Sequence, residues 1–189
     1  MISAKQYNAL LTVDAAHDLS LDMIAVHEEL LGIINHFGLS DEFGVRLIHK
    51  HFDLVDGEAM VFRHVMVKDS CEAVIMGPLP ISKAGVIEGK NFFIDVDSAT
   101  LIPYESTTKG GCDPSKYADF VHAVVQAVAG SEARNVFGLA AKPNQLVEPY
   151  TEFELPDAFR STVMVPTRMM PADFDEDQRF TPTGRPSRT

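Results

Sequence analysis

The chain contains no tryptophan, only two cysteines and no long hydrophobic run. Cys71 and Cys112 could pair only outside a reducing compartment, so we expect both to be free thiols. No apolar stretch approaches the roughly 20 residues that cross a bilayer as a helix. The N-terminal segment has Lys5 as its only lysine or arginine, and polar residues interrupt it, unlike a secretory signal. These absences predict a cytoplasmic protein without a membrane partner.

Positive charge is also scarce. Lysine and arginine number 16 against 27 aspartates and glutamates, which gives a formal net charge of −11. The sequence pI is near 4.9. A field of this sign repels phosphate backbones and anionic lipid surfaces, and no cluster of basic residues offsets it. The composition therefore argues against nucleic acid and membrane surfaces as partners.

The remaining composition is that of an ordinary globular protein. Hydrophobic residues make up 46% and charged residues 23% of the 189 residues, close to the average for soluble domains. This length suits one domain with a substantial core, which we expect over residues 1–166. Residues 167–189 form a polar, proline-containing tail that cannot bury enough apolar area to order alone. Packing of the tail across a homodimer interface would hold it.

Two segments have the apolar period of amphipathic helices. Ser20 precedes LDMIAVHEELLGIINHF and Gly38 follows it, which predicts a helix over residues 20–37 with a serine N-cap and a glycine stop. His27 falls inside the apolar arc of this helix and is expected to be buried. Asp113 and the proline after it predict a second helix over residues 114–129.

Short strand-like segments fill most of the remaining chain. Residues 44–67 alternate between apolar and polar and are broken by Asp56-Gly57, a strong hairpin signal. Further strands are predicted at residues 71–76, 85–96, 100–105, 134–141 and 159–166, and the loop between the last two is expected to hold an edge segment. The predicted fold class is therefore α+β: an antiparallel sheet, able to curl into a partial barrel, flanked by two main helices.

One cluster of histidines is unusual. In LIHKHFDL, residues 47–54, the side chains of His49, His51 and Asp53 occupy every second position and so share one face of a strand. If Asp56 and Gly57 are the central residues of a two-residue hairpin turn, His49 lies directly opposite His64. Three imidazoles would then converge inside the sheet. The arrangement depends on that register, because a bulge at the turn would move His64 out of opposition.

Three functions are consistent with this cluster. The first is an enzyme for a small organic substrate, a lyase, hydrolase or oxygenase, with a divalent zinc or iron ion held by His49, His51 and His64. The second is a metal-free lyase, isomerase or cyclase that uses the same histidines as general acid and base. The third is a non-catalytic module that binds a small ligand or mediates assembly.

Other side chains could support the histidines. Asp53 or His27 could transfer protons or orient a ligand from outside the immediate cluster. A carboxylate from a neighbouring strand, Glu72, Asp95 or Glu105, could serve the same purpose, and the sequence does not choose among the three.

The Lys109-Gly-Gly-Cys112 segment is a weaker candidate. It leads into the second helix, whose N-terminus could lower the pKa of the Cys112 thiol or attract a phosphate. Neither the P-loop spacing nor GxGxxG is present, and glycines before a helix usually form a simple turn. A turn is therefore the favoured interpretation.

Overall fold

The described part of the chain alternates between short helices and strands. The structure, a computed structural model, describes residues 1–68, 71–141, 150–155 and 159–169. Its α-helices are α1 (Ala4–Asn8), α2 (Val13–Ser20), α3 (Ile24–His36) and α4 (Ala118–Val128). Its strands are β1 (Phe43–Leu47), β2 (Glu58–Lys68), β3 (Cys71–Pro80), β4 (Glu88–Asp95), β5 (Thr100–Thr107), β6 (Phe137–Ala141), β7 (Tyr150–Glu154) and β8 (Thr162–Pro166). Short 3₁₀ turns are η1 (Leu21–Met23), η2 (Ile81–Lys83), η3 (Pro114–Tyr117), η4 (Glu132–Asn135) and η6 (Thr167–Met169).

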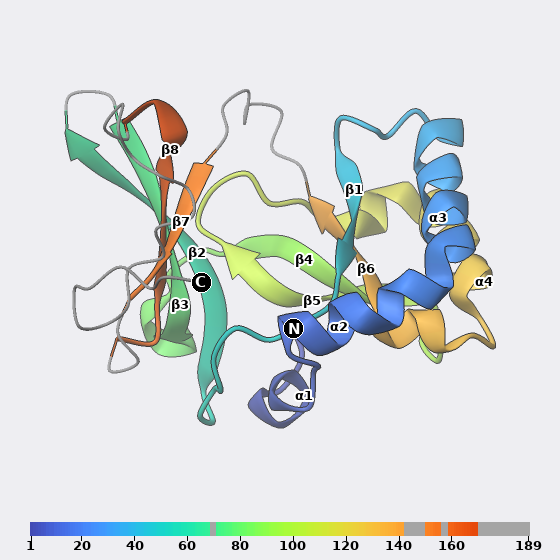
Figure 1. The fold of residues 1–189 in the computed structure, drawn as a ribbon, viewed down its shortest axis with the longest axis horizontal. Helices are drawn as coiled ribbons and strands as arrows, with labels where there is room; N and C mark the ends of the chain where they lie inside the picture. Colours follow the sequence, from blue (N-terminus) through green and yellow to red (C-terminus); the bar gives the residue numbers. More distant parts are fainter. Residues whose placement is uncertain (69–70, 142–149, 156–158, 170–189) are drawn as a thin grey trace.

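These strands form one mixed sheet that curls into a half-barrel (Figure 1). Within the described residues the order is β1-β6-β4-β5-β2-β3-β8-β7, and only the β2–β5 pairing is parallel. Helices α3 and α4 lie together beside β1 and β6, at one end of the sheet (Figure 1). The predicted α+β class, with a partial barrel and two main helices, is confirmed.

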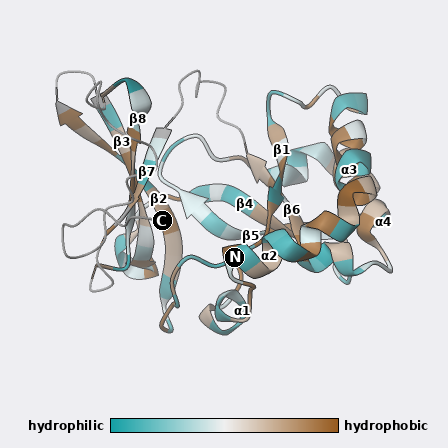
Figure 2. Ribbon diagram, viewed as in Figure 1, coloured by the Kyte–Doolittle hydropathy of each residue, from teal (hydrophilic) through white to brown (hydrophobic). Residues whose placement is uncertain are grey.

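The larger core lies between the two helices and one face of the sheet. Hydrophobic and hydrophilic residues alternate along the helical ribbons in Figure 2, as expected of amphipathic helices. The buried side chains come from both helices and from the strands β1, β4 and β6, and include Leu30, Ile34, Phe43, Phe92, Phe120, Val124 and Leu139. Each such side chain stabilises the fold by about 1.5–3 kcal/mol relative to full exposure. This packing fixes α3 and α4 to the sheet.

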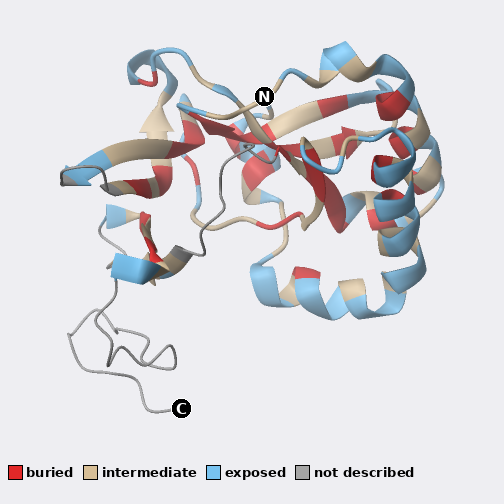
Figure 3. Cartoon of the chain, turned by 90° about the horizontal axis from the view of Figure 1, so that it is seen from above, coloured by how far each residue is buried: buried red, intermediate tan, exposed pale blue. Residues whose placement is uncertain are grey.

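A second core lines the opposite face of the sheet, which we call the inner face. It joins α1 to β2, β3 and β5 through buried side chains, namely Tyr7, Ile48, Met60, Phe62, Val74, Met76 and Tyr104. Figure 3 shows buried residues concentrated along the strands, while the outer surfaces of the helices are exposed. Side chains that are distant in sequence therefore pack together over the inner face.

The prediction of a β-hairpin at Asp56-Gly57 is wrong. The chain does turn there, since the Glu58 amide donates to the Val55 carbonyl over 3.0 Å. Of the two central residues only Gly57 has a positive φ, at 85°, which fits a type II turn, whereas a type I′ hairpin turn needs positive φ at both. The flanking segments consequently diverge. Strand β1 pairs with β6, and β2 pairs with β3 and β5.

The predicted helix boundaries are confirmed at three of the four ends. Gly38, with φ of 68°, follows the end of α3. Asp113 accepts a hydrogen bond from the Ser115 amide over 3.1 Å and caps η3, which continues into α4; Gly130, with φ of 75°, follows its end. The predicted N-cap at Ser20 is wrong, because Ser20 ends α2 and its hydroxyl donates to the His17 carbonyl.

Close packing between β4 and β6 requires a glycine. Gly138 on β6 faces Arg46 of β1, and a Cβ at this position would overlap the carbonyl oxygen of Phe92. The absence of a side chain here allows the two strands to approach.

Three remaining predictions concern the C-terminal tail, the two cysteines and membrane-spanning helices. Residues 170–189 lie outside the described residues, so the role of the tail in a homodimer stays a prediction. Cys112 is a free thiol, and the side chain of Cys71 is not among those described. No described helix is both long and apolar enough to cross a membrane.

Candidate active site

The predicted histidine pair lies on an irregular segment, residues 48–57, that α1 holds in place. Asn8 forms two hydrogen bonds with the backbone of Leu54: its amide nitrogen donates to the carbonyl over 2.8 Å, and its oxygen accepts from the amide over 2.7 Å. The Tyr7 hydroxyl accepts from the His51 amide over 3.3 Å. Backbone groups that have no strand partner are thus satisfied. The N-terminal helix therefore positions the histidines.

His49 and His51 lie side by side and are both neutral at pH 7. Their ring centroids are 4.7 Å apart. Burial lowers the pKa of His51 to about 4, with a further contribution from the positive charge of Arg46. Burial, His51 and Arg46 also lower the pKa of His49. The Nδ1 atom of His49 is 3.0 Å from the Leu47 carbonyl; because a carbonyl only accepts, Nδ1 carries the proton and Nε2 keeps a basic lone pair.

A buried carboxylate lies next to His51. Glu105, on β5, is 1% exposed. Its Oε1 accepts from the Tyr7 hydroxyl over 3.3 Å, and its Oε2 accepts from the side-chain amide of Asn91 over 2.5 Å. The His51 Nε2 atom is 3.7 Å from Oε1, too far for a hydrogen bond. Burial and the charge of Glu105 raise the pKa of Tyr7, so Tyr7 remains a hydroxyl donor.

Arg46 supplies a positive charge that offsets the negative charge of Glu105. Its neighbours Val45 and Leu47 pack toward the helical core, so alternation along β1 directs Arg46 to the inner face. Burial alone would lower the pKa of Arg46, but the charge of Glu105 and the interaction with Tyr104 together outweigh burial and raise it. Glu152, on β7 at the other edge of the sheet, contributes in the same sense. The curled sheet thus brings charges from both edges near one another.

Three polar atoms of this region are buried without a hydrogen-bond partner among the described residues: Arg46 Nε, His51 Nε2 and Asn91 Oδ1. The Arg46 guanidinium is close enough to lower the pKa of Tyr104, which burial and Glu105 raise more strongly. Each buried polar group left without a partner costs about 1–3 kcal/mol. Such a concentration at one place is typical of a site that receives a polar molecule.

A surface cleft of about 410 Å³ lies at His51. It is lined by Lys50, His51, Phe52, Asp53 and Arg160. Its volume is within the range of small-molecule sites. Since His51 lines the cleft and also faces Glu105, the imidazole connects the surface with the buried carboxylate.

Arg160 ties the wall of the cleft together. Its guanidinium donates to both carboxylate oxygens of Glu58, over 3.2 and 2.8 Å, and also to the carbonyl of Asp53. These hydrogen bonds lower the pKa of Glu58. Arg160 has a φ of 43°, a left-handed conformation that costs a non-glycine residue about 1 kcal/mol or more. The contacts with Glu58 hold this strained residue at the cleft.

Two of the predicted site residues lie elsewhere. His64 is opposite Val74 on β3, with Nδ1 3.5 Å from Glu72. His27 packs against Phe137, ring centroids 5.6 Å apart, beside a separate hollow of about 260 Å³. His27 was expected to be buried, and the structure shows it half-buried.

The predicted convergence of three imidazoles is therefore corrected to a pair, His49 and His51, because the type II turn removes the register that would have placed His64 opposite His49. In the part of the chain that the structure describes, no three histidine, cysteine, aspartate or glutamate side chains are grouped so as to hold a metal ion. Asp53 is at the cleft, but its carboxylate is 71% exposed and pairs with Lys50 over 2.9 Å.

Sequence reasoning missed most of the inner cluster. Of the three carboxylates considered, Glu105 lies near His51, Glu72 lies near His64, and Asp95 accepts from Ser98 in a turn. A charged residue inside the apolar strand TLIPYE was the available signal for Glu105. Nothing in the sequence connects Arg46 with it, because no local pattern relates β1 to β5.

Comparisons of the chain with protein-family models, with curated proteins and with solved structures found no match. The chemistry of the site itself is therefore the basis for assigning a function.

Proposed function

We propose that the chain is an enzyme that transfers protons on a small organic substrate without a metal ion, and that the cleft at His51 is the entrance to its active site. One observation carries this proposal: a fully buried carboxylate, Glu105, lies beside two neutral imidazoles, among polar atoms that have no partners within the described residues. Buried acids and bases with displaced pKa values are common at catalytic sites.

His49 and Glu105 are the candidate bases. A neutral imidazole with a free Nε2 lone pair can accept a proton at pH 7. His49 is held in this tautomer by the Leu47 carbonyl. His51, between the cleft and Glu105, can relay the proton inward. Because burial keeps both rings neutral at pH 7, solvent does not protonate them and both stay available as bases.

Arg46 and Tyr104 are the candidate electrophilic groups. Arg46 and Tyr104 are buried donors that interact with each other, and Arg46 Nε has no hydrogen-bond partner among the described residues. Such donors stabilise the negative charge that develops on a carbonyl oxygen when a proton leaves the adjacent carbon. A small carbonyl or carboxyl compound suits both the candidate bases and the candidate electrophilic groups. The reaction class is isomerisation, cyclisation or elimination.

Hydrogen–deuterium exchange tests the proposal even when the product of the reaction is unidentified. The protein, dialysed against a chelator, is incubated in D₂O with pyruvate, dihydroxyacetone and cyclohex-2-enone, and loss of the proton next to the carbonyl is followed by NMR. We expect exchange above the buffer rate for at least one compound. Glu105→Gln and His49→Gln should each slow that exchange by about 10²-fold or more, the usual contribution of a general base. His122→Gln, at an exposed position on α4, is the matched control.

Three outcomes contradict the proposal. Exchange that ceases on chelation and returns with zinc or iron would favour the metal-dependent hypothesis instead. Exchange that survives in both variants places the chemistry elsewhere. Saturable binding of these compounds without any exchange would favour a non-catalytic ligand-binding module.

A further inference from the structure

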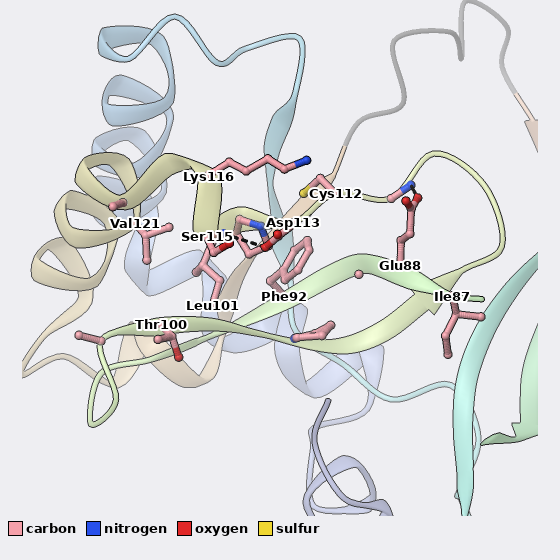
Figure 4. A pocket seen from close by; sticks show the side chains of 16 residues that line it. Ile87, Glu88, Phe92, Thr100, Leu101, Cys112, Asp113, Ser115, Lys116 and Val121 are labelled. Atoms are coloured by element: carbon pink, nitrogen blue, oxygen red, sulfur yellow. Dashed lines mark hydrogen bonds between the residues drawn. The ribbon is translucent and has the colours of Figure 1, made fainter. Parts of the chain in front are cut away.

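A larger hollow lies on the helical side of the sheet, apart from the active site. Its volume is about 660 Å³, within the range of small-molecule sites. Figure 4 shows it between the β4–β5 hairpin and the start of α4, with the buried side chains of Phe92, Leu101 and Val121 behind its wall. The partly exposed apolar residues that line it are Ile87, Pro103 and Pro114. Its walls come from the β4–β5 hairpin, the loop before η3, and the first residues of η3 and α4.

The loop of residues 108–113, between β5 and η3, is attached to β4 in a way that leaves the hollow open. The Cys112 amide donates to the Gly89 carbonyl over 3.0 Å, which forms an isolated antiparallel bridge. A Cβ at Gly89 would overlap the ring of Phe92, and one at Gly111 would overlap Glu88. The loop thus lies flat along the strand edge and leaves the space between hairpin and helix unfilled.

The mouth of the hollow has an excess of negative charge. Glu88 accepts from the Gly111 amide over 3.1 Å, and Asp113 accepts from the Ser115 amide over 3.1 Å, so both carboxylates are held at the rim. The hydrogen bonds from Ser115 lower the pKa of Asp113. Lys116 is the one cation among the described residues that line this hollow. The rim carries two negative charges against one positive charge, on a chain whose net charge is −11.

The Cys112 thiol contributes no charge to this site. Burial, and to a lesser extent Asp113, raises its pKa to about 11. Cys112 is therefore a neutral wall of the hollow at pH 7, and the favoured interpretation of its segment as a turn agrees with its position. A nucleophilic role would require the opposite shift.

We infer that this hollow binds an amphipathic organic cation: a molecule with an apolar ring or chain against the partly exposed Ile87, Pro103 and Pro114 and an ammonium group at the rim beside Glu88 and Asp113. Burial of the ligand's apolar part against these side chains contributes to the binding free energy. The carboxylates select for positive charge. The site is independent of the proposed proton-transfer function.

Three probes with the same ring system and different charge test this inference. We would measure binding of 2-naphthylmethylamine, 2-naphthylmethanol and 2-naphthoate to the full chain by ligand-observed NMR at low salt. The ammonium should bind about two- to fivefold more tightly than the alcohol, the effect of a partly exposed ion pair, and the carboxylate should bind more weakly than the alcohol. Added salt should reduce the difference between ammonium and alcohol.

Two charge variants act in opposite directions. Glu88→Gln should weaken binding of the ammonium and Lys116→Gln should strengthen it, while both leave the alcohol unchanged. Ala118→Trp, which places a bulky ring at the pocket from an exposed position of α4, should weaken all three probes, whereas Ala118→Ser should not. Thermal unfolding checks that each variant folds.

The inference is overturned if the carboxylate binds as tightly as the ammonium. It is also overturned if the two charge variants shift ammonium binding in the same direction, or if Ala118→Trp leaves the affinities unchanged.

Discussion

Removing the imidazole of His51 should reduce the loss of stability that the protein suffers in mild acid. Burial lowers the pKa of His51 from 6.5 to about 4 in the folded chain. Between these values the unfolded chain binds more protons than the folded chain. The contribution of His51 to stability is therefore complete above pH 6.5 and is lost progressively as the pH falls toward 4.

The size of the effect follows from the two pKa values. Each unit of pKa difference corresponds to about 1.36 kcal/mol, so the full loss at low pH is about 3 kcal/mol. Between pH 7.0 and pH 5.5 the same relation gives about 1 kcal/mol. The upper part of the range is the practical one, because the sequence pI is near 4.9 and solubility falls there. The side chain is 16% exposed, so solvent screens it little.

Urea unfolding followed by circular dichroism measures this difference. Wild type, His51→Gln and the control His122→Gln are unfolded at pH 7.0 and pH 5.5. The wild type and the control should lose about 1 kcal/mol more than His51→Gln on acidification. If His51→Gln shows the same pH dependence as the wild type, the ring is not held neutral by its surroundings, and its role as a relay between cleft and carboxylate loses its basis.

Three further substitutions test the packing around the site. Burial, aided by Arg46, lowers the pKa of Lys90 to about 8 from 10.5, so the wild type should gain stability between pH 8 and 10.5 in urea unfolding and Lys90→Met should abolish that gain; an unchanged profile would contradict this. At pH 7 the substitution should change stability by less than the roughly 3 kcal/mol of the pKa difference, because it also removes the hydrogen bond to the Ala141 carbonyl. Gly138→Ala should cost about 2 kcal/mol or more because of the overlap with Phe92, measured as a fall in Tm, and wild-type Tm would refute the close approach. Ala99 has a φ of 52°, so Ala99→Gly should raise stability by up to about 1 kcal/mol, and destabilisation in the same assay would argue against strain there.

The local elements were predictable because their signals act over a few residues. The cap at Asp113 and the glycines after α3 and α4 set helix ends through bonds to the adjacent turn. Short strand-like segments between turn residues predicted the strands that became β3, β5 and β8. Asp56-Gly57 was predicted as a turn for the same reason. Whether the segments on either side of the turn pair with each other depends on what each segment contacts elsewhere in the fold.

The pairing of strands and the composition of the site are tertiary properties. Strand β2 lies between β3 and β5, and its parallel contact with β5 has no counterpart in the sequence pattern. The Tyr7–Glu105 hydrogen bond joins residues 98 positions apart. Sequence patterning could identify His49 and His51 as unusual because they are close together in the chain. Their neighbours Arg46, Tyr104 and Glu105 became neighbours only when the sheet curled, since burial and charge act through space and not along the chain.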